Sequence, residues 1–178
     1  MNKFILLLMV LVLAIPSRAQ KFSSDKSFIR FFSSAAIEDI TAENRMGSSI
    51  FNEETGEVVF SVPIREFQFA ESLMKGEFNQ KYMESEKFPK AIFEGKITGY
   101  AKDVSSEQTV VAAGKLTIHG VTKNVEIHGS IKNENDHKVM KSKFIVKLED
   151  YDVKVPEFLW QKIAEQVEVT VEFNYKSL

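Results

Sequence analysis

The sequence predicts an all-β protein in which eight antiparallel strands close into an extended barrel, with one amphipathic helix near the mouth. Three observations support this prediction. Apolar residues recur at every second position in several segments, which is typical of strands with one buried face. A single stretch has the spacing of a helix instead. The 15 Phe residues among 178 require a large buried interior.

Length and composition exclude several classes of protein. A chain of 178 residues suits one domain of roughly 100–200 residues. The net charge is -2, so the chain lacks the basic excess of a nucleic-acid-binding protein. With no Cys it has no disulfide, no thiolate nucleophile and no Cys-ligated zinc. We therefore expect no nucleic-acid partner.

Residues 1–19 have the three parts of a signal peptide. Lys3 precedes an apolar run over residues 4–15, and small residues flank a cleavage point after Ala19. The run is shorter than the roughly 20 apolar residues that a membrane span requires. We therefore expect no stable membrane anchor, and a single barrel domain over residues 20–178 that is periplasmic or secreted.

The strand-like segments follow one another along the chain and are separated by turn signals such as Glu54-Thr55-Gly56 and residues 133–136. The first two segments are less regular than the rest, and the later ones alternate strictly. In chain order they cover residues 28–32, 37–51, 58–64, 91–99, 112–118, 125–131, 144–148 and 167–173. Acidic pairs such as Glu53-Glu54 are expected in solvated turns.

The hairpin around Gly120 can be given a register. Pairing Gly120 with Val125 across a four-residue turn aligns both apolar sets on one face. His119, Glu126 and His128 then share the solvent face. A weak surface pair is the commoner meaning of such a group, and no H-x-x-x-H spacing supports a metal site, so we expect neither metal nor cofactor.

The helix-like stretch runs from Ala70 to Met83. Its apolar residues are spaced three or four apart, with charged residues between them, and Pro89 marks the return to a strand. A shorter helical turn is predicted from Pro156 to Ala164.

Motifs for catalysis are missing from the sequence. There is no G-x-S-x-G turn, no His matched to a Ser in a known arrangement, and no glycine-rich phosphate loop. We therefore predict that the protein is not an enzyme.

A barrel of this size either fills with side chains or holds one small ligand. Five small residues are expected to face inward among the Phe rings. They are Gly95, Gly99, Ala112, Gly114 and Gly129. They could leave a tunnel, or they could face large residues in tapered packing, and alternation alone does not separate the two.

Residues 114–125, GKLTIHGVTKNV, resemble the G-x-L-T-I-x-G-V-T-x-x-V signature of the YceI-like family. Residues 67–95 are similar to the helix and following strand of one branch, and a looser resemblance covers residues 28–175. The resemblance to this family implies a lipocalin-like, secreted or periplasmic barrel that binds polyisoprenoids or other lipids in a long apolar tunnel. The chain departs from the family at residues 71–74 and 149–153, so the resemblance implies nothing about head-group recognition.

The function implied is a carrier or store that holds the apolar chain of an isoprenoid, fatty acyl or similar amphiphile. The residues expected to line the tunnel are Phe60, Val62, Phe69, Met74, Phe78, Phe93, Ile97, Leu116, Ile118, Ile127, Phe144, Val146, Val169 and Phe173. The cations expected near a head group are Arg65, Lys75, Lys81 and Lys87.

Two alternatives stay open at this point. The first is a filled-core barrel that acts as an interaction or stress-response protein through its surface or as a homodimer. The second is an enzyme that acts on the bound lipid.

Overall fold

The computed structural model describes residues 21–34, 39–134, 137–154 and 164–178. The predicted signal peptide and most of the predicted helical turn after Pro156 lie outside these ranges. Within them, no helix is both long enough and apolar enough to cross a lipid bilayer.

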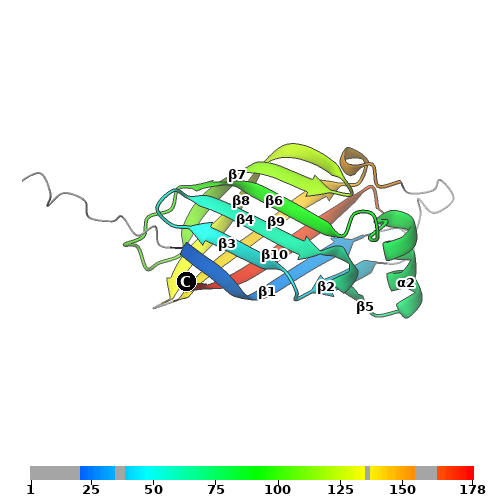
Figure 1. Cartoon of the computed structure of the whole chain (residues 1–178), viewed down its shortest axis with the longest axis horizontal. Coiled ribbons are helices and arrows are strands. Elements are labelled where there is room, and N and C mark those ends of the chain that lie inside the picture. The colour runs from blue at the N-terminus through cyan, green and yellow to red at the C-terminus, as the bar shows by residue number, and fades with distance from the viewer. Residues whose placement is uncertain (1–20, 35–38, 135–136, 155–163) are drawn as a thin grey trace, which may run out of the picture.

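Ten strands form one antiparallel sheet that closes because β1 (Lys21–Ser33) pairs with β10 (Gln166–Ser177) (Figure 1). The strands between them are β2 (Ile40–Asn44), β3 (Ser48–Asn52), β4 (Glu57–Pro63), β5 (Gln68–Phe69), β6 (Lys90–Thr98), β7 (Gln108–Ile118), β8 (Val121–Glu134) and β9 (His137–Lys147). The barrel runs in the order β10-β9-β8-β7-β6-β4-β3-β1, and β2 and β5 extend the sheet beyond β1. The predicted eight-stranded antiparallel barrel is confirmed.

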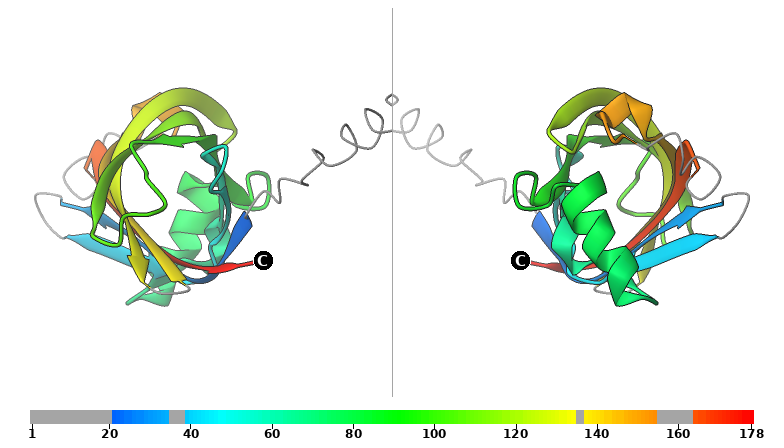
Figure 2. Two further views of the ribbon diagram at one scale, coloured as in Figure 1. Left: turned by 90° about the vertical axis from the view of Figure 1, so that its left-hand side faces the viewer. Right: turned by 90° about the vertical axis from the view of Figure 1, so that its right-hand side faces the viewer.

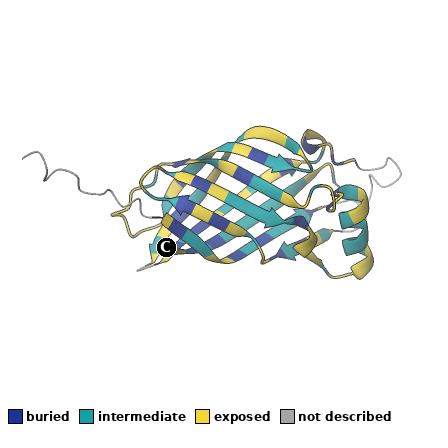
Figure 3. Cartoon of the chain, viewed as in Figure 1, coloured by how far each residue is buried: buried dark blue, intermediate teal, exposed yellow. Residues whose placement is uncertain are grey.

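The alternation in the sequence becomes the inside and the outside of the barrel wall (Figure 3). On β4, Val58 is buried, while its neighbour Val59 is exposed. On β10, Phe173 and Tyr175 are buried. Burial of these apolar faces supplies most of the driving force for closure.

The hairpin between β7 and β8 differs from its predicted register. The pairs are Ile118 with Val121 and Gly114 with Val125, so the turn is only His119-Gly120. Both turn residues have positive φ, 51° and 77°, as a two-residue turn that matches the twist of the strands requires. The predicted four-residue turn was wrong because the two registers put the same residues on the same face, so alternation cannot distinguish them.

The predicted helix is confirmed and lies across one end of the barrel (Figure 2). It consists of α2 (Ser72–Glu77), which continues into a π-helical turn, η2 (Phe78–Tyr82). Two short 3-10 turns complete the described structure, η1 (Ile64–Glu66) and η3 (Glu149–Tyr151).

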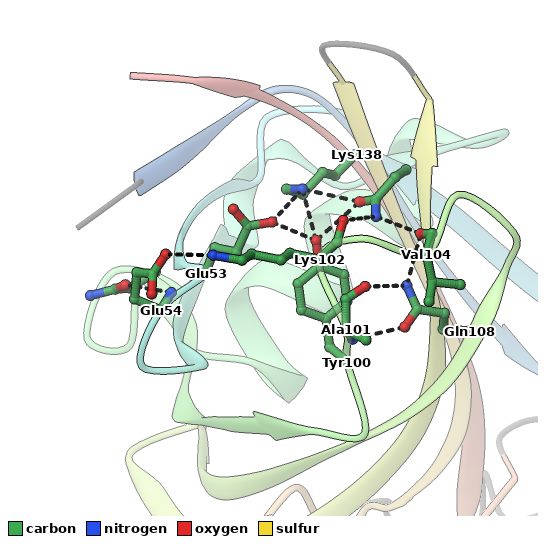
Figure 4. Close-up of polar contacts among 10 residues, drawn as sticks. Glu53, Glu54, Tyr100, Ala101, Lys102, Val104, Gln108 and Lys138 are labelled. Carbon is green, nitrogen blue, oxygen red and sulfur yellow. Dashed lines mark hydrogen bonds and ion pairs between the residues drawn. The ribbon is translucent and has the colours of Figure 1, made fainter. Parts of the chain in front are cut away.

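A buried ion pair closes the opposite end (Figure 4). Lys138 Nζ lies 2.6 Å from Glu53 Oε1, and the two side chains are only 9% and 5% exposed. The Tyr100 hydroxyl donates to the same carboxylate at 2.5 Å and accepts from Lys138 at 2.8 Å. Burial, reinforced by the Glu53 carboxylate, raises the pKa of Tyr100, so its hydroxyl stays a donor.

Glu53 therefore corrects the expectation of a solvated turn. Its neighbour Glu54 is exposed, as expected, and pairs with Lys102 at 3.5 Å. The partner of Glu53 is far away in the sequence, and local composition carries no sign of it. Lys138 Nζ also lies 4.3 Å from the centroid of the Phe22 ring, which adds a cation–π contact.

We expect Lys138→Ala to destabilise the barrel by about 3–5 kcal/mol, because it leaves the Glu53 carboxylate buried without its cation. Urea unfolding measures the change. The control is Lys143→Ala, which removes an exposed lysine that pairs with Glu168 at 2.8 Å and should cost less than about 1 kcal/mol. Equal losses in the two variants would show that the buried pair contributes nothing beyond a surface pair.

Candidate functional site

The barrel encloses a cavity of about 690 Å³ between the buried ion pair and α2. This volume lies within the range of roughly 300–1,000 Å³ that is typical of small-molecule sites. Aliphatic and aromatic side chains make up most of the lining, so the interior is not filled by the protein's own side chains.

Small residues contribute to this space at some positions and not at others. Ala112 and Gly129 line the cavity. At Gly95, by contrast, an added Cβ would lie 2.7 Å from Cζ of Phe93, so the ring of Phe93 occupies that space. Gly95 therefore packs against a large ring, as in tapered packing, whereas Ala112 borders open space in the cavity.

All fourteen residues predicted to line a tunnel border the cavity. They come from β4, β5, the helical segment and the strands β6 to β10. Their contact with a ligand remains a prediction. Further lining residues that were not predicted include Phe31, Met140, Tyr151, Val153, Val167 and Val171.

Some of these missed residues carried a usable signal. Val167 and Val171 share the alternation of Val169 on β10 and follow from it. Tyr151 and Val153 lie in and just after η3, where no periodicity exists. Only the folded chain brings them to the cavity.

Four Phe rings pack together where the cavity meets the helix. Phe78 of η2 stacks on Phe31 of β1 at a centroid distance of 5.5 Å. Phe67 and Phe69 lie 5.7 and 5.0 Å from the same Phe78 ring. This aromatic cluster attaches the helical segment to the barrel and covers that end of the cavity.

A few polar groups border the cavity beside the helix. Glu77 and Lys81 form an ion pair at 2.7 Å, and Tyr82 follows on the same turn. The hydrogen bond that Lys81 donates to the Glu77 carboxylate raises the pKa of Lys81, and burial raises the pKa of Tyr82. At neutral pH both groups are therefore hydrogen-bond donors, able to bind an oxygen-bearing head group.

The other predicted cations do not border the cavity. Arg65 pairs with Glu86 at 2.6 Å on the surface. Lys75 donates to Gln68, and Lys87 lies over the ring of Phe88. Lys81 is thus the one of the four that the structure places at the site. Proximity to the helix in sequence did not determine which side chains turn inward.

His119 joins three segments at the rim of the barrel. Its Nδ1 lies 3.2 Å from the carbonyl oxygen of Tyr151 in η3, and its Nε2 lies 3.0 Å from Glu84 Oε2. Its ring meets the ring of Phe88 edge-on at 4.7 Å. His119 is therefore a structural link, and its position in the turn removes it from the predicted solvent face.

Glu126 and His128 remain neighbours on that exposed face, with His128 Nε2 3.8 Å from Glu126 Oε1. Within the part of the chain that the structure describes, no group of three or more His, Asp or Glu side chains is arranged to hold a metal ion.

Comparison with known proteins gives a family and a set of similar folds. The sequence profile of the YceI-like domain matches residues 21–175. A polyisoprenoid binding domain from Saccharophagus degradans, implicated in plant cell wall breakdown, has a TM-score of 0.77 at 18% identity and covers 88% of this chain and 98% of its own. BcnA from Burkholderia cenocepacia has a TM-score of 0.71 at 14% identity, with 83% and 95% covered.

The YceI protein of Campylobacter jejuni is also similar, with a TM-score of 0.61 at 14% identity, and the match covers 80% of this chain and 86% of its own. No curated protein sequence matched the chain. At these identities the structural matches establish the fold.

We expect Phe78→Ala to destabilise the protein by about 3 kcal/mol and to expose α2 and η2, because it removes the ring that three other rings contact. Urea unfolding measures the loss, and amide hydrogen exchange locates it. Leu73→Ala on the same helix, where the side chain is 71% exposed, is the control and should change little. Unchanged exchange in α2 after Phe78→Ala would show that the aromatic cluster does not hold the helix.

Proposed function

This chain belongs to the YceI-like family, and on that premise we propose that it binds the apolar chain of an isoprenoid, fatty acyl or similar amphiphile inside the barrel, as a carrier or store without catalysis. The observation that carries the proposal is the apolar cavity of about 690 Å³. The similar domain from Saccharophagus degradans, which is described as polyisoprenoid-binding, supports the same class of ligand.

Affinity for such a ligand comes from buried apolar area. Each buried methylene contributes about 0.8 kcal/mol, so a chain of about twelve carbons gains roughly 10 kcal/mol before the costs of ordering are subtracted. An apolar ligand therefore needs few directional contacts to bind tightly, and the cavity tolerates variation in the ligand's hydrocarbon chain. The flexible side chain of Met74 in the lining suits such variation.

The polar end of the amphiphile belongs beside the helix. Lys81 and Tyr82 are the donors there, and the rest of the wall offers the ligand mainly carbon. A carboxylate, phosphate or hydroxyl head group would accept from them, while the tail extends toward Ile131 and Met140.

We further propose that residues 1–19 are removed as a signal peptide, and that residues 20–178 act as one domain in the periplasm or outside the cell. The basic residue, apolar run and small residues of this segment support the proposal. A carrier in an aqueous compartment shields an apolar chain from water.

Native mass spectrometry of protein purified without detergent tests the function directly. A stoichiometric amphiphile of a few hundred daltons, released and identified after denaturation, is the expected result. A mass equal to that of the chain alone, unchanged after incubation with isoprenoids and fatty acids, would contradict the proposal and favour a protein that acts through its surface.

We expect Ala112→Phe to weaken binding of long chains at least about tenfold, because a ring at this position takes up cavity volume. Titration with cis-parinaric acid, a fatty acid that fluoresces in apolar surroundings, measures the affinity. The control is Ala113→Phe, one residue along on the exposed face of β7, which should bind like the unmodified protein. Equal affinity in both variants would place the bound chain elsewhere.

A further inference from the structure

β8 and β9 are neighbours in the barrel wall, but they pair over only part of their length. Their paired residues run from Gly129 with Ser142 to Glu134 with His137. On its other edge β8 pairs with β7 from Val121 onward, and β9 pairs with β10 as far as Lys147. In the described chain, the facing edges of residues 121–128 and 143–147 therefore lack strand partners.

The last pair marks where the two strands part. An added Cβ on Gly129 would lie 2.5 Å from the carbonyl oxygen of Lys141, so the backbones are close at this point. One step further, the Ser142 hydroxyl donates to the carbonyl oxygen of His128 at 2.6 Å. A side chain of β9 thus satisfies a carbonyl of β8 at the point where the backbone pairing ends.

η3 lies at the other end of the unpaired stretch. Lys123 of β8 is 3.6 Å from Asp150 of η3, and His119 contacts the Tyr151 carbonyl oxygen. The wall is thus connected through η3 near the rim and through the strand pair at Gly129. We call the stretch between them, β8 residues 125–128 and β9 residues 143–146, the seam window.

The cavity extends to the seam window. Ile127 and Phe144 border it from the two strands. Ser130 and Lys141 border it as well, although their side chains bond on the outer surface, to Glu107 at 2.6 Å and to Glu172 at 3.4 Å. Those two residues pair with each other in the ladder, so it is Ile127 and Phe144 that bring the cavity to the seam window.

We propose that the seam window is a lateral portal through which an apolar chain enters and leaves the cavity. The backbone N–H and C=O groups on the facing edges of the window have no strand partners. The strands can therefore part here without breaking ladder hydrogen bonds. Passage at one end of the barrel would instead disturb the ion pair of Glu53 and Lys138. Beside the helix, where the cavity reaches exposed residues, an apolar chain would have to pass the ion pair of Glu77 and Lys81. Ile145, 53% exposed on the outer face of the window, offers the chain a first apolar contact.

This inference rests on the proposed function, since it needs a chain that binds. The test closes the window with the double variant Glu126→Cys and Ile145→Cys. These two positions would face each other if the pairing continued, and neither borders the cavity. The chain has no Cys of its own, so the engineered pair supplies the only thiols. Where oxidation leaves free thiols, a short bis-maleimide cross-links the pair.

Stopped-flow uptake of cis-parinaric acid gives the readout. With the window cross-linked, we expect both association and dissociation to slow at least about tenfold while Kd stays within about twofold, because a portal controls rates and not the bound state. The matched control is Val139→Cys with Asn174→Cys, which cross-links β9 to its fully paired neighbour β10 outside the seam window and should leave both rates unchanged.

The outcomes separate the two proposals. No uptake by the unmodified protein overturns the proposed function. If the cross-linked Glu126→Cys, Ile145→Cys variant takes up the probe as fast as the unmodified protein does, the portal is overturned and the proposed function stands. The portal is supported if the disulfide slows association and dissociation, if reduction restores both rates, and if the control cross-link does not slow them.

Discussion

Closure of the sheet by β1 and β10 is the constraint on which the rest of the structure depends. The two strands pair from Phe22 with Ser177 to Phe32 with Glu168, across a bulge near Asp25. An open sheet with the same alternation would have to stack its apolar face on another layer. Once closed, it has an inside, and the apolar side chains from eight strands converge on one enclosed volume.

The two ends and the wall of this volume differ in the forces that hold them. One end is held by Glu53, Lys138 and Tyr100, where charge and hydrogen bonds leave little freedom to move. The other is held by stacked Phe rings on a short helical segment, which dispersion and apolar burial keep in place. Between β8 and β9 the wall is paired only from Gly129 to Glu134 of β8, so the strands can part beyond Gly129 without breaking ladder hydrogen bonds.

The sequence was a good guide wherever a residue's role follows from local periodicity. Most of the alternating strand residues predicted to face inward border the cavity, as do Phe78 and Met74 at helical spacing. The prediction was wrong for Gly99, which lies past the end of β6 with a positive φ and is exposed. It was a poor guide where a role depends on a distant partner. The hairpin register, the burial of Glu53 and the surface position of Arg65 all depend on contacts that no local pattern encodes.

By itself the sequence determined the class of fold, because a two-residue period in one segment after another can bury its apolar face only in a closed or stacked antiparallel sheet. It also determined the apolar character of the interior. The tertiary structure alone decided that this interior is hollow beside Ala112 but filled beside Gly95, because the volume left over depends on how rings from different strands pack. It also decided where the wall is unpaired, because a strand's edge is free or bonded according to its neighbour in space.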